Sequence, residues 1–143
     1  MPERPDKLST VPLKCIGIIL CDNAYRIAGT LNLVVVNTFH KLGVPGCPCR
    51  FPRITVLYTV TEGHGTYDLE LAVVNARTGQ DVATYRDSYT VNDPLAIGDV
   101  QMILHNVPLP EPGKYWIELR CNGELVGQRP FYVDVIKRQR PSD

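Results

Sequence analysis

The stretch DVQMILHNVPLPEPGKYWIELRCNGE, residues 99–124, decides the fold class of this 143-residue chain. Apolar and polar residues alternate before and after its proline-rich corner, which is the pattern of β-strands with one buried face. Asn122-Gly123 is a strong hairpin signal, because both residues tolerate the positive φ angles of a type I′ turn. The stretch therefore predicts a strand, a corner, a second strand, a tight turn and a closing strand that reaches Val135.

The rest of the chain repeats this alternation between turn segments, and no helical period of useful length is present. The pattern favours an all-β, antiparallel β-sandwich of about eight strands. We assign residues 13–136 to this domain, residues 1–12 to a flexible N-terminal arm and residues 137–143 to a flexible C-terminal tail. The predicted strands are 13–21, 31–39, 53–61, 66–75, 81–91, 97–107, 114–121 and 125–136.

Three segments carry a more specific prediction. Residues 33–36, Leu-Val-Val-Val, are apolar on both faces, as in a central strand that is covered on both sides. Residues 81–91 are more polar, which is typical of an edge strand. Residues 40–52 contain three prolines and two glycines, so we expect an irregular loop there.

The charge balance and the apolar runs restrict the possible partners. With 15 Lys+Arg and 15 Asp+Glu the formal net charge is zero, whereas a nucleic-acid partner requires a basic face. The longest apolar run, residues 16–20, is far shorter than the ~20 residues of a membrane span, and the N-terminus lacks the features of a signal peptide. We therefore expect a cytoplasmic protein with no nucleic-acid partner and no membrane segment.

The cysteines agree with that compartment. Five is an odd number, so they cannot form a closed set of intrachain disulfides. Cys15 and Cys21 lie on one predicted strand, about 20 Å apart when extended. A disulfide needs Cα atoms within about 7 Å, so these two cannot bridge each other. We expect no disulfide, and free thiols that are buried as small hydrophobic side chains.

A spaced set of residues resembles the passage from strand E to strand F of immunoglobulin-like domains: Val100, Met102, Leu104, Val107, Glu111, Gly113 and Tyr115. In those domains the acidic residue, the glycine and the tyrosine mark a corner at which the tyrosine hydroxyl bonds to nearby backbone. Ile117 stands where such domains carry their second inter-sheet cysteine. The resemblance implies an immunoglobulin-like sandwich without its disulfide.

Four segments resemble, more closely, an uncharacterised bacterial family of small stand-alone immunoglobulin-like proteins: residues 19–22, 51–53, 107–115 and 122–130. The likeness covers nearly all of residues 13–136. Its motifs are turns and corners, so the resemblance implies a fold and no chemistry. The family it points to has no assigned activity.

The best chemical candidate is the Cys47-Pro48-Cys49 loop. Two thiolates one residue apart could share zinc or another soft metal, with His40 as a third ligand. A closed zinc site needs four ligands, and no second cysteine pair has ligand spacing. The alternative is a rigid proline loop with incidental thiols. Thiol-redox motifs usually space their cysteines by two residues and begin a helix, and this loop does neither. We expect no cofactor unless this loop binds a metal.

Catalytic apparatus is not evident in the sequence. His40, His64 and His105 lie on separate predicted loops or strands, and the serines have no nucleophile-elbow context. A glycine-rich phosphate loop requires a following helix, and none is predicted. We therefore expect a protein that is not an enzyme.

Two aromatic residues suggest a contact surface instead. Trp116 and Tyr132 have the opposite parity to their buried neighbours, which places them on the outer face of the last hairpin beside Glu118 and Arg120. Tyr and Trp on a wet strand face are enriched at protein interfaces. They can equally be a cross-strand pair that stabilises the hairpin by ~0.2–1 kcal/mol.

These residues favour a binding function over a catalytic one. We predict a module that binds a protein partner or itself. A homodimer could form by strand addition, if the sheet edge beside residues 125–136 is free. The alternative is the metal-binding or thiol-redox protein described above.

Overall fold

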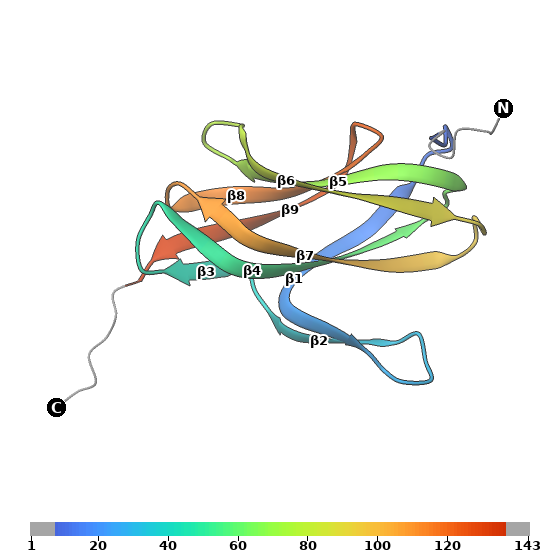
Figure 1. The fold of residues 1–143 in the computed structure, drawn as a ribbon, viewed down its shortest axis with the longest axis horizontal. Coiled ribbons are helices and arrows are strands. Elements are labelled where there is room, and N and C mark those ends of the chain that lie inside the picture. The colour runs from blue at the N-terminus through green and yellow to red at the C-terminus, as the bar shows by residue number, and fades with distance from the viewer. Residues whose placement is uncertain (1–7, 137–143) are drawn as a thin grey trace.

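The computed structural model describes residues 8–136 and shows nine β-strands in two stacked sheets (Figure 1). One sheet has the order β2-β1-β4-β7 and the other β3-β9-β8-β5-β6. The five cysteines are free, and no helix of residues 8–136 could cross a membrane. The predicted all-β sandwich is confirmed for the described residues. The strands are β1 (Lys14–Arg26), β2 (Leu33–Thr38), β3 (Lys41–Val44), β4 (Cys49–Thr61), β5 (Gly65–Asn75), β6 (Asp81–Val91), β7 (Ile97–Leu109), β8 (Gly113–Cys121) and β9 (Glu124–Val135).

The core lies between the two sheets, and the strands other than β2 contribute buried side chains to it. β8 shows the pattern clearly, because its alternate side chains Tyr115, Ile117 and Leu119 are fully buried. β4, in the other sheet, supplies facing side chains such as Tyr58, and β5, the neighbour of β8 in its own sheet, adds Leu71 to the core. Each fully buried aliphatic or aromatic side chain contributes about 1.5–3 kcal/mol to folding.

The corner between β7 and β8 has the predicted hydrogen bonds. The buried Tyr115 hydroxyl accepts a bond from the Glu111 backbone N–H at 3.2 Å and donates one to the Glu111 carbonyl at 2.5 Å. The next turn has positive φ angles at both Asn122 (51°) and Gly123 (90°), as a type I′ hairpin requires. Both predictions for this stretch are confirmed.

The predicted irregular loop at residues 40–52 contains β3 and the start of β4, so this prediction was wrong for residues 41–44 and 49–52. β3 pairs with β9, and the pair is parallel, in a sandwich whose other described pairs are antiparallel. Leu42 and Val44 are buried, so the segment alternates as a half-buried strand does. The prolines that suggested a loop come after β3. The sheet edge beside β9, proposed above for strand addition, is therefore occupied at residues 132–135.

The second correction concerns β2, which was predicted to be a central strand covered on both sides. β2 pairs only with β1 and forms an edge of its sheet. Val34 and Val36 are 46% and 43% exposed. Residues 33–36 are apolar, but an apolar strand pattern indicates only that burial is favourable. It does not identify the surface that covers the strand. The predicted edge strand at residues 81–91 is confirmed as β6.

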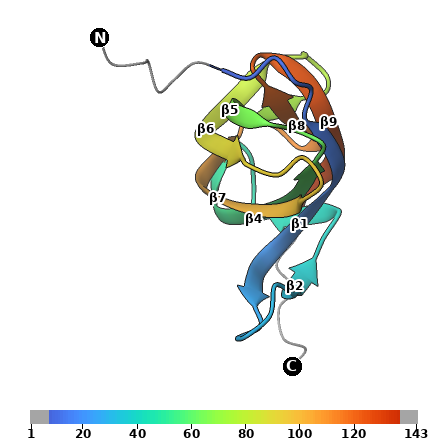
Figure 2. The same cartoon turned by 90° about the vertical axis from the view of Figure 1, so that its right-hand side faces the viewer.

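The β1–β2 hairpin extends out of the sandwich because β1 is longer than its pairing with β4. β1 pairs with β4 from Lys14 to Cys21, and residues 23–26 pair with β2 alone. Figure 2 shows this hairpin leaving the body of the two sheets. The end of the hairpin is thus a two-stranded ribbon.

Part of the predicted N-terminal arm is attached to the sandwich. The Ser9 backbone N–H donates to the Thr66 carbonyl at 2.8 Å, and the Tyr67 hydroxyl donates to the Val11 carbonyl at 2.7 Å. Leu13 is buried in the core. The rest of the predicted arm, residues 1–7, and the predicted tail, residues 137–143, lie outside the described residues.

We expect Tyr115→Phe to lower the free energy of unfolding by about 1–3 kcal/mol, because the substitution leaves the part-buried Glu111 backbone N–H and C=O groups without their partner. Urea denaturation followed by tryptophan fluorescence measures the change. Tyr132→Phe, at an exposed tyrosine, is the matched control and should change stability by less than about 0.5 kcal/mol. Equal effects of the two substitutions would show that the corner hydrogen bonds do not stabilise the fold.

Candidate functional site

The Cys47-Pro48-Cys49 loop leads into β4, and both of its cysteines are half-buried against the core. Burial raises the pKa of the Cys47 thiol, and the neighbouring Cys49 and Glu111 raise it further. A raised pKa favours the neutral thiol, whereas metal binding and thiol exchange both need the thiolate. The environment of Cys47 therefore does not activate it.

The structure does not assemble the predicted three-ligand set. His40 Nδ1 lies 3.2 Å from Arg129 Nη2, and Arg129 Nη1 donates to the Ile18 carbonyl at 2.6 Å. His40 is thus part of the contact between β9 and β1. Within residues 8–136 no three His, Cys, Asp or Glu side chains are grouped so that they could hold a metal ion. The proximity of His40 to Cys47 in sequence does not place it beside the two thiols.

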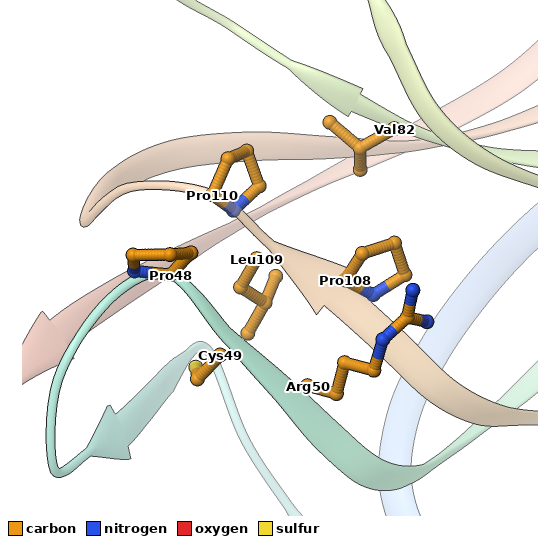
Figure 3. Close-up of a pocket in the computed structure, with 7 residues that line it drawn as sticks. All are labelled: Pro48, Cys49, Arg50, Val82, Pro108, Leu109 and Pro110. Carbon is orange, nitrogen blue, oxygen red and sulfur yellow. The ribbon is translucent and has the colours of Figure 1, made fainter.

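A shallow pocket of about 490 Å³ lies between the start of β4 and the end of β7 (Figure 3). Its lining is mostly proline and aliphatic: Pro48, Cys49, Arg50, Val82, Pro108, Leu109 and Pro110. The only charged group in the lining is Arg50, which donates from Nη1 to the Asn106 carbonyl at 3.2 Å. The lining holds no carboxylate or imidazole that could act as a general acid or base beside Cys49.

The outer face of β8 and β9 carries the two aromatic residues singled out in the sequence. Trp116 is half-buried, and the Lys114 ammonium lies 4.4 Å from the centre of its ring. Tyr132 pairs with Lys114 across the two strands and is 45% exposed. Lys114 therefore contacts Trp116 and neighbours Tyr132 on one face.

Glu118 and Arg120 lie on the same face and bind each other. The Arg120 guanidinium lies 3.0 Å from Glu118, 3.0 Å from Glu70 and 2.8 Å from Asp81, with its side chain 22% exposed. The hydrogen bond from Arg120 lowers the pKa of the Asp81 carboxyl below its usual value. This charge cluster links β8 to β5 and β6, so the bonding capacity of Arg120 is used within the chain.

The β1–β2 hairpin is the surface that the sequence analysis missed. Its exposed apolar side chains are Tyr25, Ile27, Leu31, Val34 and Val36. Leu31, near the tip, is 81% exposed, and residues 27–38 contain no charged side chain. Contiguous exposed apolar surface of this kind marks interaction sites on soluble proteins. The signal was present in the apolar run at residues 33–36.

Comparison with known proteins supports the fold. No curated protein matches the sequence. The alkylpurine DNA glycosylase AlkC of Pseudomonas fluorescens, solved bound to DNA containing an abasic-site analogue, is similar in structure with a TM-score of 0.55 and 12% sequence identity. The match covers 89% of this chain but only 32% of AlkC, so the chain spans about a third of that enzyme's length.

An immunoglobulin-like protein from Pseudomonas aeruginosa also matches, with a TM-score of 0.37 and 14% identity over 86% of this chain and 92% of that one. The family assignment comes from the sequence. A family model described as a family of unknown function, DUF6941, matches residues 17–134, and the chain therefore belongs to the DUF6941 family.

Proposed function

We propose that this chain is a non-catalytic protein-interaction module and that the β1–β2 hairpin contacts the partner. The observation that carries the proposal is the exposed, uncharged apolar surface of this hairpin. Exposing contiguous apolar surface to water is unfavourable by roughly 25 cal/mol per Å², so a second protein surface that covers it gains that free energy. A strand edge lies beside the same side chains, so a partner can add backbone hydrogen bonds.

The hairpin is a better contact surface than the outer face of β8 and β9. There, Lys114 already packs on Trp116, and Glu118 and Arg120 already bind each other. A partner that bound these side chains would have to break or compete with the interactions they already make. Val34 and Val36 have no charged or polar side-chain group to lose a partner, and they are 46% and 43% exposed.

A non-catalytic role is supported by the separation of the three histidines, all of which lie in the described residues. His40 follows β2, His64 lies between β4 and β5, and His105 lies on β7. A general base needs an orienting partner and a reacting group within hydrogen-bond distance. The pocket at Pro48 and Pro108 is apolar and brings none of these histidines together.

The partner class we favour is protein rather than nucleic acid. AlkC was solved bound to DNA, but its likeness to this chain concerns the fold. DNA binding depends on neutralising phosphates with Lys and Arg. This chain carries as many acidic as basic residues, and residues 27–38 of the hairpin carry neither.

The alternative role, a metal-binding or thiol-redox protein, depends on Cys47 and Cys49. The loop keeps the two thiols together but supplies no third ligand from residues 8–136, so the interaction proposal has the stronger support. Elemental analysis of the purified protein separates the two. One equivalent of zinc or copper per chain, lost in Cys47→Ser/Cys49→Ser, would favour the alternative.

The test of the interaction proposal is site-specific photo-crosslinking in the cells that produce the protein. A photoreactive amino acid replaces Val34 on the hairpin or, as a matched control, the exposed Thr84 on β6. We expect discrete protein adducts from position 34 and none from position 84, because only the hairpin lies against a partner. Absence of adducts from position 34, or equal adducts from both positions, would contradict the proposal.

The charge cluster around Arg120 should stabilise the fold without contributing to binding. We expect Arg120→Met to lower the free energy of unfolding by about 1–2 kcal/mol, between the values for exposed and buried ion pairs, because Glu70, Glu118 and Asp81 lose their shared cation. Urea denaturation measures this loss. The crosslinking pattern from position 34 should be unchanged, and loss of the adducts in folded Arg120→Met would assign binding to that face.

A further inference from the structure

We propose that the partner of the β1–β2 hairpin is a second copy of this chain, and that the two copies join through antiparallel pairing of β2 with β2 about a two-fold axis at Val34. This inference rests on the proposed function, because it identifies the partner of the same surface. Three arguments support it. The β2 edge has no charged residue and no proline, the alternation of hydrogen bonds in the hairpin leaves backbone groups of β2 free, and a two-fold axis gives a closed dimer.

The four edge strands of the sandwich differ in how they are protected. β2, β7, β3 and β6 are the strands at the ends of the two sheets. Natural sheets protect such edges with charged residues and proline, because an unprotected edge pairs with other chains. β3 contains Lys41, β6 contains Asp81, Arg86 and Asp87, and β7 contains Asp99 and Pro108, whereas β2, Leu-Val-Val-Val-Asn-Thr, contains no charge and no proline.

The hairpin's hydrogen bonds show which groups of β2 are free to pair. The Ile27 N–H donates to the Asn32 carbonyl at 2.9 Å across the hairpin. In an antiparallel ladder the hydrogen-bonded positions alternate, so residues 34 and 36 bond to β1. Leu33 and Val35 direct their N–H and C=O groups to the opposite side, which is the free edge. These four backbone groups form the template for a partner strand.

In one register of self-pairing, the free residues Leu33 and Val35 of the two copies pair with each other. Leu33 of each copy pairs with Val35 of the other, which closes four backbone hydrogen bonds and sets Val34 opposite Val34 of the second copy. Side chains directly opposite each other lie about 4.5–5.5 Å apart at Cβ and share a face. Two exposed valines are then in contact at the axis, and no like charges meet because residues 27–38 are uncharged.

A second copy provides hydrogen-bond partners for the free N–H and C=O groups of β2 in both chains at once. Pairing about a two-fold axis is isologous and closed, so both copies use the same free residues, Leu33 and Val35. The combined sheet has the order β7-β4-β1-β2-β2-β1-β4-β7 and ends in β7 on both sides. β7 carries Asp99 and Pro108, which block further strand addition. Assembly therefore stops at the dimer.

The test is a charge exchange at Val34, measured by analytical ultracentrifugation between 1 and roughly 100 µM, the range of affinities for modest interfaces. Wild type should sediment at twice the 16.0 kDa chain mass. Val34→Lys and Val34→Glu should each sediment as a monomer, at least tenfold weaker in association, because like charges meet at the axis. An equimolar mixture of the two should recover a 1:1 dimer. Thr84→Lys, on exposed β6, should remain dimeric.

A second variant tests the edge itself without adding charge. Val35→Pro removes the N–H that faces the free edge and leaves the bonds between β1 and β2 in place, so it should also give a monomer. Circular dichroism confirms that each variant is folded, which is expected because the hairpin lies outside the core.

Each remaining outcome overturns the inference in a distinguishable way. A wild-type dimer that neither Val34 variant weakens would place the dimer interface elsewhere. A wild-type monomer throughout the range would exclude the second copy. With adducts from position 34 to a different protein, the proposed function would then stand without this inference. With no adducts, both would fail.

Discussion

Every β-sheet leaves unpaired N–H and C=O groups along its two edges, and this constraint explains much of how the chain is arranged. β3 covers the edge of β9, which would otherwise be the exposed end of the last hairpin. β6 and β7 keep their edges open to water behind charged side chains and, in β7, a proline. β2 has none of these devices. Within residues 8–136, this unprotected edge lies on the same hairpin as the exposed apolar side chains of Leu31, Val34 and Val36.

The sandwich itself provides a rigid support for that projection. The buried Tyr115 hydroxyl fixes the corner between β7 and β8, and the charge cluster at Arg120 joins β8 to β5 and β6. β1 is anchored by its pairing with β4 as far as Cys21 and by burial of Ile18 and Leu20. The hairpin continues directly from this anchored half, so its direction is set by the core.

The sequence predicted features that depend on local chemistry. Tyr115 and Asn122-Gly123 identified a corner and a turn because their geometry is determined by the residues themselves. β3 was missed because Leu42 and Val44 form too short an alternation beside three prolines. The position of β2 was missed because residues 33–36 have the same pattern whether the sandwich or another chain covers them. The placement of His40 depended on long-range pairing with Arg129, which no spacing rule contains.

The position of β2, which residues 33–36 left ambiguous, connects folding to association. A two-stranded ribbon is marginally stable alone in water, because too little apolar surface is buried to offset its conformational entropy. Residues 23–26 and their β2 partners form such a ribbon beyond the edge of β4. An added strand supplies both hydrogen bonds and cover for Val34 and Val36, so a partner stabilises the hairpin as it binds. In the proposed dimer, β2 would lie in the interior of the combined sheet, between β1 and β2 of the second copy.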